Sequence, residues 1–335
     1  MTDSPRPAEP RLTSLAHGGG CGCKIAPGVL EGILRGGIAL PVPPDLLVGI
    51  ETSDDAAVYR VNAHQAIVAT TDFFMPIVDD PGDFGRIAAT NAISDVYAMG
   101  GTPVFALALV GMPINTLSAG IPIAGGNTID SVEPIYGLVA IGLVDPAHLK
   151  RNADARPGDA LVLGKPLGVG IFSAALKKGA LDAASYARLI ATTTRLNTPG
   201  PELARLQGVH AMTDVTGFGL AGHSLEMARG SGCRLGIDWS RVPLLDQARE
   251  LAEAGFVTGA SGRNWASYGG SVNYARAMTA VDQALLCDPQ TSGGLLVACA
   301  QETVSDVLAI FQRHGFAAAA VIGEVAEGEP GLTVL

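Results

Sequence analysis

The sequence predicts an α/β (α+β) fold made of two α/β halves. Short apolar runs bounded by turn residues alternate with segments whose apolar residues recur at helical spacing. The 335 residues are more than one domain of usual size needs. Residues 145–159 contain two prolines and three aspartates without sustained periodicity, so we place the boundary between the halves there.

The strands and helices follow from the same patterns. Strands are expected at residues 66–70, 104–110, 136–144, 160–163 and 295–300. Helices are expected at residues 83–99 and 219–229, which end near Gly100-Gly101 and Gly230. With 48% hydrophobic and 16% charged residues, the chain can bury a large core, and this composition argues against a disordered chain.

One connection is short for a parallel arrangement. Only residues 115–120 and their flanks separate the strand that ends near Met112 from the apolar segment that starts at Ile121. A parallel crossover needs about a dozen residues. The two segments are therefore expected to pair as a hairpin or to lie apart.

Charge and cysteine usage restrict the partners and the compartment. The net charge of −10 and the lack of a basic stripe argue against nucleic acid. Apolar stretches such as residues 104–110 are too short to span a membrane. The proline-rich start has no apolar core of a secretory signal, and five cysteines, an odd number, fit a reducing compartment. We expect a cytoplasmic protein.

Several acidic residues adjoin predicted strands or lie on a predicted helix. Asp54-Asp55 precede one apolar run, and Asp72 and Asp214 end two others. Each alone fits a turn or N-cap aspartate. Asp95, however, shares a helix face with Asn91 and therefore points inward, where an unpaired carboxylate is unfavourable.

Convergence of these acids would require cations. Two like charges about 4 Å apart repel by roughly 4 kcal/mol at an effective dielectric of 20. Mg²⁺ prefers carboxylate oxygens and usually keeps substrate phosphates as further ligands. The acidic segments together therefore suggest a site for a nucleoside triphosphate and Mg²⁺.

A glycine-rich segment carries two thiols and a lysine. Gly18–Lys24 lacks the ending of a phosphate-binding P-loop, because Cys23 precedes Lys24 and Ile25 follows it. Lys24 is expected to lower the pKa of the Cys21 thiol and favour the thiolate. The alternatives are a disordered glycine tail or half of a Zn²⁺ site.

Two further glycine-containing segments have weaker signals. Gly125-Gly126-Asn127 can approach phosphate or ribose, or form an ordinary hairpin turn. Residues 288–294, Asp-Pro-Gln-Thr-Ser-Gly-Gly, are interpreted as a structural turn before a strand.

Taken together, the motifs resemble the selenophosphate synthetase (selenide, water dikinase) family, within the aminoimidazole-ribonucleotide-synthetase-like superfamily. The likeness runs from about residue 12 to residue 323. The segments that carry it are His17–Ile25, Asp54–Tyr59, Thr70–Val78, Asn91–Asp95, Arg263–Trp265 with Tyr268-Gly269, and Asp288–Gly294. The thiol and lysine segment is what separates this family from the rest of the superfamily.

The resemblance implies a phosphotransferase that forms selenophosphate, AMP and orthophosphate from ATP, selenide and water. It implies that Cys21 is the catalytic thiol and Lys24 the essential cation. The implied Mg²⁺ ligands are Asp55, Asp95 and Asp214. The implied ATP contacts are Lys24, Thr52, Ser53, Asp54, Asp72, Asp95, Gly125, Gly126 and Asn127.

The family fold implies three segments and a homodimer. These are a flexible N-terminal segment (1–20), an ATP-binding and dimerisation domain (21–152) that contributes strands to a dimeric barrel, and a C-terminal α/β domain (153–335). Relatives usually carry a helix near residues 115–120, which is missing here. The alternatives are therefore another ATP-dependent enzyme of the superfamily, a catalytically impaired relative, or an inactive selenium- or metal-binding scaffold.

Overall fold

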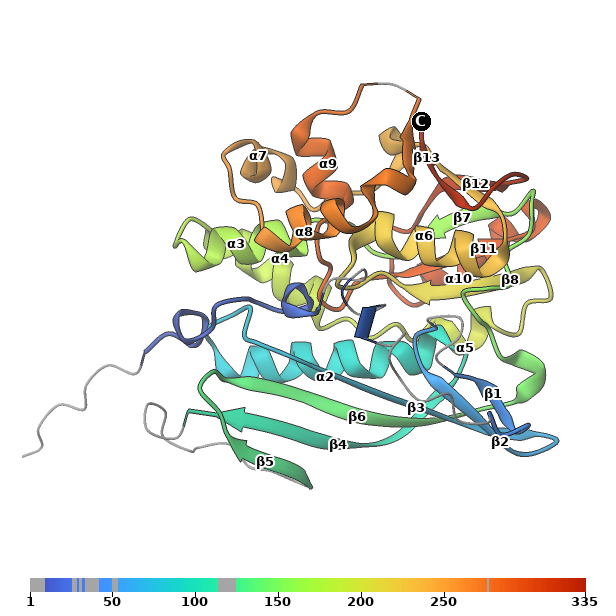
Figure 1. Cartoon of the computed structure of the whole chain (residues 1–335), viewed down its shortest axis with the longest axis horizontal. Helices are drawn as coiled ribbons and strands as arrows, with labels where there is room; N and C mark the ends of the chain where they lie inside the picture. The colour runs from blue at the N-terminus through green and yellow to red at the C-terminus, as the bar shows by residue number, and fades with distance from the viewer. Residues whose placement is uncertain are drawn as a thin grey trace, which may run out of the picture.

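The computed structural model describes residues 10–25, 29, 32–33, 42–49, 54–113, 125–275 and 277–335. The described chain forms two sheets with helices between and above them (Figure 1). The N-terminal part contains two short 3₁₀ turns, η1 (Leu12–Leu15) and η2 (Cys21–Cys23).

The first sheet has six strands in the order β1-β2-β3-β6-β4-β5. They are β1 (Leu46–Val48), β2 (Ala57–Asn62), β3 (Gln65–Phe74), β4 (Thr102–Met112), β5 (Gly126–Asp130) and β6 (Ile135–Val144). All neighbours are antiparallel except β4 and β5, which are parallel.

Among the described elements, the long helix α2 (Pro81–Ala98) covers one face of this sheet. Asp80 caps its start by accepting a hydrogen bond from the Asp83 amide at 2.8 Å, and proline occupies the first turn, where no amide donor is needed. On β3, Val68 and Phe74 are buried on the helix side, whereas Ile67 and Phe73, which directly precede them, are exposed on the other side. This alternation is the period of a strand with one covered face.

The second sheet has seven strands in the order β10-β13-β9-β12-β7-β11-β8. They are β7 (Ala160–Leu163), β8 (Val209–Asp214), β9 (Arg234–Ile237), β10 (Val272–Tyr274), β11 (Leu295–Cys299), β12 (Ala320–Ala326) and β13 (Gly331–Val334). The helices that pack around it are α3 (Val169–Lys177), α4 (Ala183–Thr193), α5 (Gly200–Leu203), α6 (Gly219–Ser231), α7 (Ala248–Glu253), α8 (Gly259–Tyr268), α9 (Ala280–Leu286) and α10 (Val304–Arg313).

Helix α2 lies between the two sheets and joins them (Figure 1). Phe84 and Ile87 of α2 belong to the same buried cluster as Leu161 and Leu163 of β7. The Asn197 side-chain amide donates to Ser94 Oγ of α2 at 2.7 Å. The site residues on α2 are therefore held by both halves of the chain. Within the described ranges, no helix has the length and apolar composition to cross a bilayer.

The expected strands and helices are present, and most extend a few residues beyond their predicted bounds. Helix α2 covers residues 81–98, and α6 continues to Ser231, where Gly232 ends it in a left-handed conformation. The three cysteines outside the segment Gly18–Lys24, which are Cys233, Cys287 and Cys299, are buried and free.

The expectation that the two segments pair as a hairpin or lie apart is wrong. Strand β5 begins at Gly126 and pairs parallel to β4, with Ala108 opposite Gly126. The error came from starting the second strand at Ile121. Counted from Met112 to Gly126, the connection is long enough for a parallel crossover. The expected loss of a helix near residues 115–120 concerns a stretch outside the described residues.

Candidate functional site

Three carboxylates from distant parts of the chain converge where the two sheets meet. Asp55 precedes β2, Asp95 lies on the last turns of α2, and Asp214 ends β8. One oxygen from each lies within 4.8 Å of the others. Asp95 points inward as its spacing from Asn91 predicts, with 9% exposure against 0% for Asn91.

Each carboxylate of this cluster is destabilised in its charged form. Burial first, and then repulsion from Asp214 and Asp95, raises the pKa of Asp55 well above its ordinary value. Burial and repulsion from Asp214 and Asp72 raise the pKa of Asp95 in the same way. Burial also raises the pKa of Asp214.

The cluster holds unused acceptor capacity. Thr213 Oγ1 donates to Asp55 Oδ1 at 2.8 Å, and Thr70 Oγ1 donates to Asp95 Oδ2. Asp55 Oδ2 and Asp214 Oδ2 are buried without any hydrogen-bond partner among the described residues. Buried acceptors without donors are rare in folded proteins, and a cation ligated there would satisfy them.

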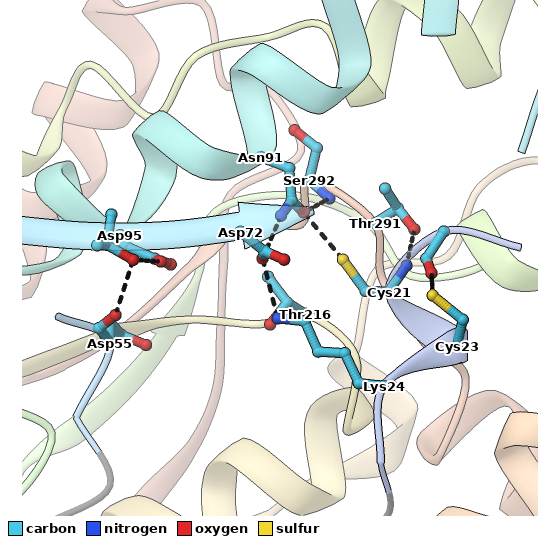
Figure 2. A network of polar contacts seen from close by, with 12 residues as sticks. Cys21, Cys23, Lys24, Asp55, Asp72, Asn91, Asp95, Thr216, Thr291 and Ser292 are labelled. Carbon is cyan, nitrogen blue, oxygen red and sulfur yellow. Dashed lines mark hydrogen bonds and ion pairs between the residues drawn. The ribbon is translucent and has the colours of Figure 1, made fainter. Parts of the chain in front are cut away.

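A second polar network lies beside this cluster (Figure 2). Asp72, on the helix-facing side of β3, accepts hydrogen bonds from Lys24 Nζ at 2.9 Å and from the Asn91 side-chain amide at 2.6 Å. The Lys24 side chain is partly buried, at 34% exposure, and attraction to Asp72 and Asp95 raises the pKa of its ammonium well above the ordinary value despite the opposing effect of burial. Lys24 therefore stays cationic at the edge of the carboxylate cluster.

The thiol loop, Gly18–Lys24, is seated in this network through Cys21. The Cys21 side chain is 1% exposed, its backbone amide donates to Thr291 Oγ1 at 3.0 Å, and its thiol donates to Asn91 Oδ1 at 3.2 Å. Cys23 Sγ instead donates to the Gly20 carbonyl oxygen at 2.9 Å. Figure 2 shows the two sulfur atoms directed to different partners.

The expectation that Lys24 favours the thiolate form of Cys21 is wrong for this arrangement. Lys24 does act in that direction, but burial and the negative charge of Asp72 outweigh it and raise the thiol pKa well above its ordinary value. The thiol is therefore protonated while the loop is seated. The zinc alternative gains no support, because the metal-competent cluster found among the described residues consists of the three aspartates.

Of the remaining expected ATP contacts, Asp54 adjoins Asp55, and its charge contributes to the raised pKa of that residue. Asp54 accepts a hydrogen bond from the Asn152 amide at 2.7 Å, which ties the segment before β2 to the boundary between the halves. Thr52 and Ser53 lie outside the described residues.

Gly125, Gly126 and Asn127 lie at the far edge of the first sheet. Gly126 is in the same transverse row as Asp72, through Leu138 and Ala108, but three strands away. Three strand spacings are about 14 Å. Within one chain these residues do not line the carboxylate cluster.

Sequence reasoning missed two residues that contact the thiol loop or its partners. Thr291 and Ser292 belong to the segment interpreted as a structural turn, yet Thr291 accepts the Cys21 amide and the Ser292 amide donates to Asn91 Oδ1 at 2.7 Å. Small polar residues just before a buried strand were the only local signal, and their partners are 270 and 201 residues away in sequence.

Two sheets that enclose a carboxylate cluster place the chain in the class of AIR synthase related proteins. The family profile described as AIR synthase related protein, N-terminal domain, matches residues 53–144, and that of the C-terminal domain matches residues 156–334. A solved thiamine-monophosphate kinase from Stenotrophomonas maltophilia K279a shares this fold, with a TM-score of 0.54 at 21% identity over 87% of this chain and 91% of that one. The hydrogenase maturation protein HypE in complex with ATP gives a TM-score of 0.59 at 19% identity over 87% and 86%.

Sequence relatives are much closer and identify the family. The "Selenide, water dikinase" of Dechloromonas aromatica (strain RCB) is 66% identical over 342 residues, covering 97% of this chain and 98% of the relative. That of Paraburkholderia xenovorans (strain LB400) is 62% identical over 354 residues, covering 100% of both. The chain belongs to the selenide, water dikinase family. Because the second alignment is longer than this chain of 335 residues, that relative has residues without a counterpart here.

Proposed function

We propose that the chain catalyses the ATP-dependent synthesis of selenophosphate from selenide and water, with release of AMP and orthophosphate. The observation that carries this proposal is the assembly of a thiol, a partly buried cation and three convergent carboxylates at one place. Hydrogen bonds through Asp72 and Asn91 connect Lys24 to Cys21, and Lys24 and Asp72 are close enough to Asp95 of the cluster to interact with it electrostatically. Membership of the dikinase family supports the choice of selenide as acceptor.

We propose that Asp55, Asp95 and Asp214 hold Mg²⁺ for the nucleotide. Their unpartnered buried oxygens and mutual repulsion fit a hard divalent cation better than they fit the bare protein. A bound Mg²⁺ would supply positive charge to the phosphate oxygens of ATP. Phosphoryl transfer depends mainly on positioning and charge neutralisation, and Lys24 provides a fixed cation next to the same site.

The thiol loop orients selenide and excludes water in this proposal. Cys21 is almost fully buried when the loop is seated, so the loop can cover bound reactants and keep solvent from intercepting the first transfer. Asp72 and Asn91 fix the positions of Lys24 and Cys21 relative to each other.

We also propose a homodimer formed through the uncovered face of the first sheet. That face presents large apolar side chains that are between 44% and 60% exposed, from the strands β2, β3, β4 and β5: Tyr59, Phe73, Val104, Phe105, Leu107 and Ile129. Several exposed large apolar side chains on one face of a sheet favour an interaction surface. In such a dimer, the Gly125-Gly126-Asn127 segment of one copy would contact the nucleotide bound by the other copy. The division at residues 21–152 and 153–335 accords with this role of the first half.

The cytoplasm is the proposed location. All five cysteines are free, which suits a reducing compartment.

An anaerobic assay of AMP release tests the function. The unmodified protein is expected to release AMP from ATP only when selenide is present. Cys21→Ser and Lys24→Ala are each expected to abolish selenide-dependent AMP formation while the melting temperature stays close to that of the parent. Cys23→Ser is the matched control and should retain activity. Cys23 lies on the same loop, but its thiol donates a hydrogen bond to the Gly20 carbonyl oxygen.

The outcomes separate the alternatives. AMP release without selenide would identify another ATP-dependent enzyme of the superfamily. ATP and Mg²⁺ binding without any release would identify an impaired relative. Parent-like turnover by Cys21→Ser would remove the thiol from the mechanism.

A further inference from the structure

The turn Asp288–Gly294, which precedes β11, is built to a fixed shape in the interior of the second half. The Asp288 carboxylate is fully buried and accepts the Gly170 amide at 2.9 Å at the start of α3. The Gln290 side chain accepts the Gly168 amide at 3.1 Å and donates to Asp288 Oδ2 at 2.8 Å. These bonds satisfy buried polar groups and fix the turn to the start of a helix.

Ser292 in this turn is held in an unfavourable conformation. Its φ of 57° lies in the left-handed region, which among the described non-glycine residues only Gln247 shares. Such conformations cost free energy and persist where the surroundings fix them, often at functional sites. Here the Ser292 amide is directed at Asn91 Oδ1 and its carbonyl oxygen at Lys165 Nζ, both at 2.7 Å.

Lys165 anchors the turn from behind. The residue is 2% exposed, and its ammonium donates to two backbone carbonyl oxygens, those of Ser292 and Arg195, each at 2.7 Å. Burial lowers the pKa of Lys165 to about 7, so keeping this amine in the interior is costly unless those bonds are made. The arrangement ties the backbone of the turn to the segment after α4.

The thiol loop is shaped to fit this turn closely. A Cβ atom on Gly20 would overlap Thr291 Oγ1, and one on Gly22 would lie 3.2 Å from Pro289 Cγ. In the second half, a Cβ atom on Gly217 would lie 2.8 Å from the Cys21 carbonyl oxygen of the loop. Glycine at these three positions lets the backbone of the loop approach the second half.

We propose that the turn Asp288–Gly294 is the seat on which the thiol loop docks, and that Thr291 and Ser292 are positioning residues for Cys21. Thr291 binds the Cys21 backbone directly, whereas Ser292 acts on the thiol through Asn91. Lys165 acts one step further back, through Ser292. This inference rests on the proposed catalytic role of Cys21. In it, residues of the second half of the chain hold the thiol loop of the first half in place.

Thr291→Val tests the proposal, with Thr291→Ser as the matched control. Valine keeps the shape of threonine but leaves the buried Cys21 amide without its acceptor, whereas serine keeps the hydroxyl. We expect Thr291→Val to increase the rate of Cys21 alkylation by iodoacetamide about fivefold or more, since a lost buried hydrogen bond loosens the seat. Thr291→Ser should react like the parent. Peptide mass spectrometry resolves Cys21 from Cys23, and buried Cys233 serves as the internal reference.

Two further readouts distinguish positioning from general loss of structure. Because burial raises the pKa of the Cys21 thiol, undocking should shift the pH profile of its alkylation downward in Thr291→Val. Selenide-dependent turnover should fall while the KM for ATP and the melting temperature stay near those of the parent. Lys165→Met should produce the same alkylation profile although Lys165 does not contact the loop.

Unchanged Cys21 alkylation in Thr291→Val would overturn the docking proposal, as would equal effects of the valine and serine variants. Faster alkylation with unchanged selenide-dependent AMP release would support the seat but overturn the catalytic role of Cys21. The two failures are therefore distinguishable.

Discussion

In the metal-free protein, ionisation of each carboxylate of the metal-competent cluster lowers the stability of the folded state. The folded-state pKa of Asp55 is raised, so the native state binds more protons than the unfolded state above about pH 4. This group therefore contributes less stability as the pH rises through that window. A cation at the cluster offsets the effect, because it interacts favourably with the ionised form.

Asp55→Asn is expected to separate stability from metal binding. Without Mg²⁺ at pH 7 to 8, the variant should melt about 2 °C or more above the parent, since one buried charge is removed. The stabilisation of the parent by Mg²⁺ should grow between pH 5 and pH 8 and be largely absent from the variant. Thermal melts with EDTA and with Mg²⁺ measure both effects, and exposed Glu327→Gln is the control. Equal Mg²⁺ stabilisation in parent and variant would contradict the assigned ligand.

The sequence predicts residue roles where the signal is local. The spacing of Asn91 and Asp95 on one helix face correctly places Asp95 inside. The protonation of Cys21 could not be predicted in the same way, because it depends on burial by segments far away in the chain. Thr291 was missed for the same reason: its contact with Cys21 spans 270 residues.

At the scale of elements, the position of α2 on its sheet sets the geometry of the site. The helix carries both Asn91 and Asp95, and it packs closely on β6 because Gly142 leaves room for Val96. A Cβ atom at position 142 would overlap Val96 Cγ1 and lie 3.0 Å from the Thr102 carbonyl oxygen. A small shift of α2 would therefore displace two residues of the site together.

Gly142→Ala is expected to destabilise the protein by about 1–3 kcal/mol through overpacking. The same change should weaken Mg²⁺-dependent nucleotide binding, because Asp95 moves with the helix. Gly85→Ala, on α2 itself with no atom within 4 Å of the added Cβ, is the matched control and should stabilise by up to about 1 kcal/mol. Chemical denaturation and nucleotide titration measure the two effects. Nucleotide binding as tight as in the parent, in a strongly destabilised Gly142→Ala variant, would show that overpacking at position 142 does not displace Asp95 through α2.

Element types were predicted more reliably than strand pairing. Alternating burial along β3 and helical spacing along α2 follow directly from residue patterns. The parallel pairing of β4 and β5 was missed because the pattern did not locate the start of β5 at Gly126. Placing the start of this strand a few residues too early made the connection from β4 look too short for a parallel crossover.

At the scale of the whole molecule, the two faces of the first sheet differ in what covers them. Helix α2 and the second half of the chain cover one face, and no described element covers the other (Figure 1). On the open face, Phe105 is 56% exposed and lies opposite Ile141, beside Leu107 at 44%. Leaving such side chains in water forgoes roughly 1.5–3 kcal/mol for each one that could be buried.

The homodimer proposal therefore predicts the effect of a charge on this face. The parent should sediment as a dimer at micromolar concentration, and Phe105→Asp should sediment as a monomer, because the interface would have to bury an unpaired carboxylate. Val257→Asp, at a 38% exposed apolar position in the second half, should leave the dimer intact. Sedimentation velocity distinguishes the species, and circular dichroism verifies that both variants fold. A monomeric parent, or a Phe105→Asp variant that remains dimeric, would show that this face is not the interface.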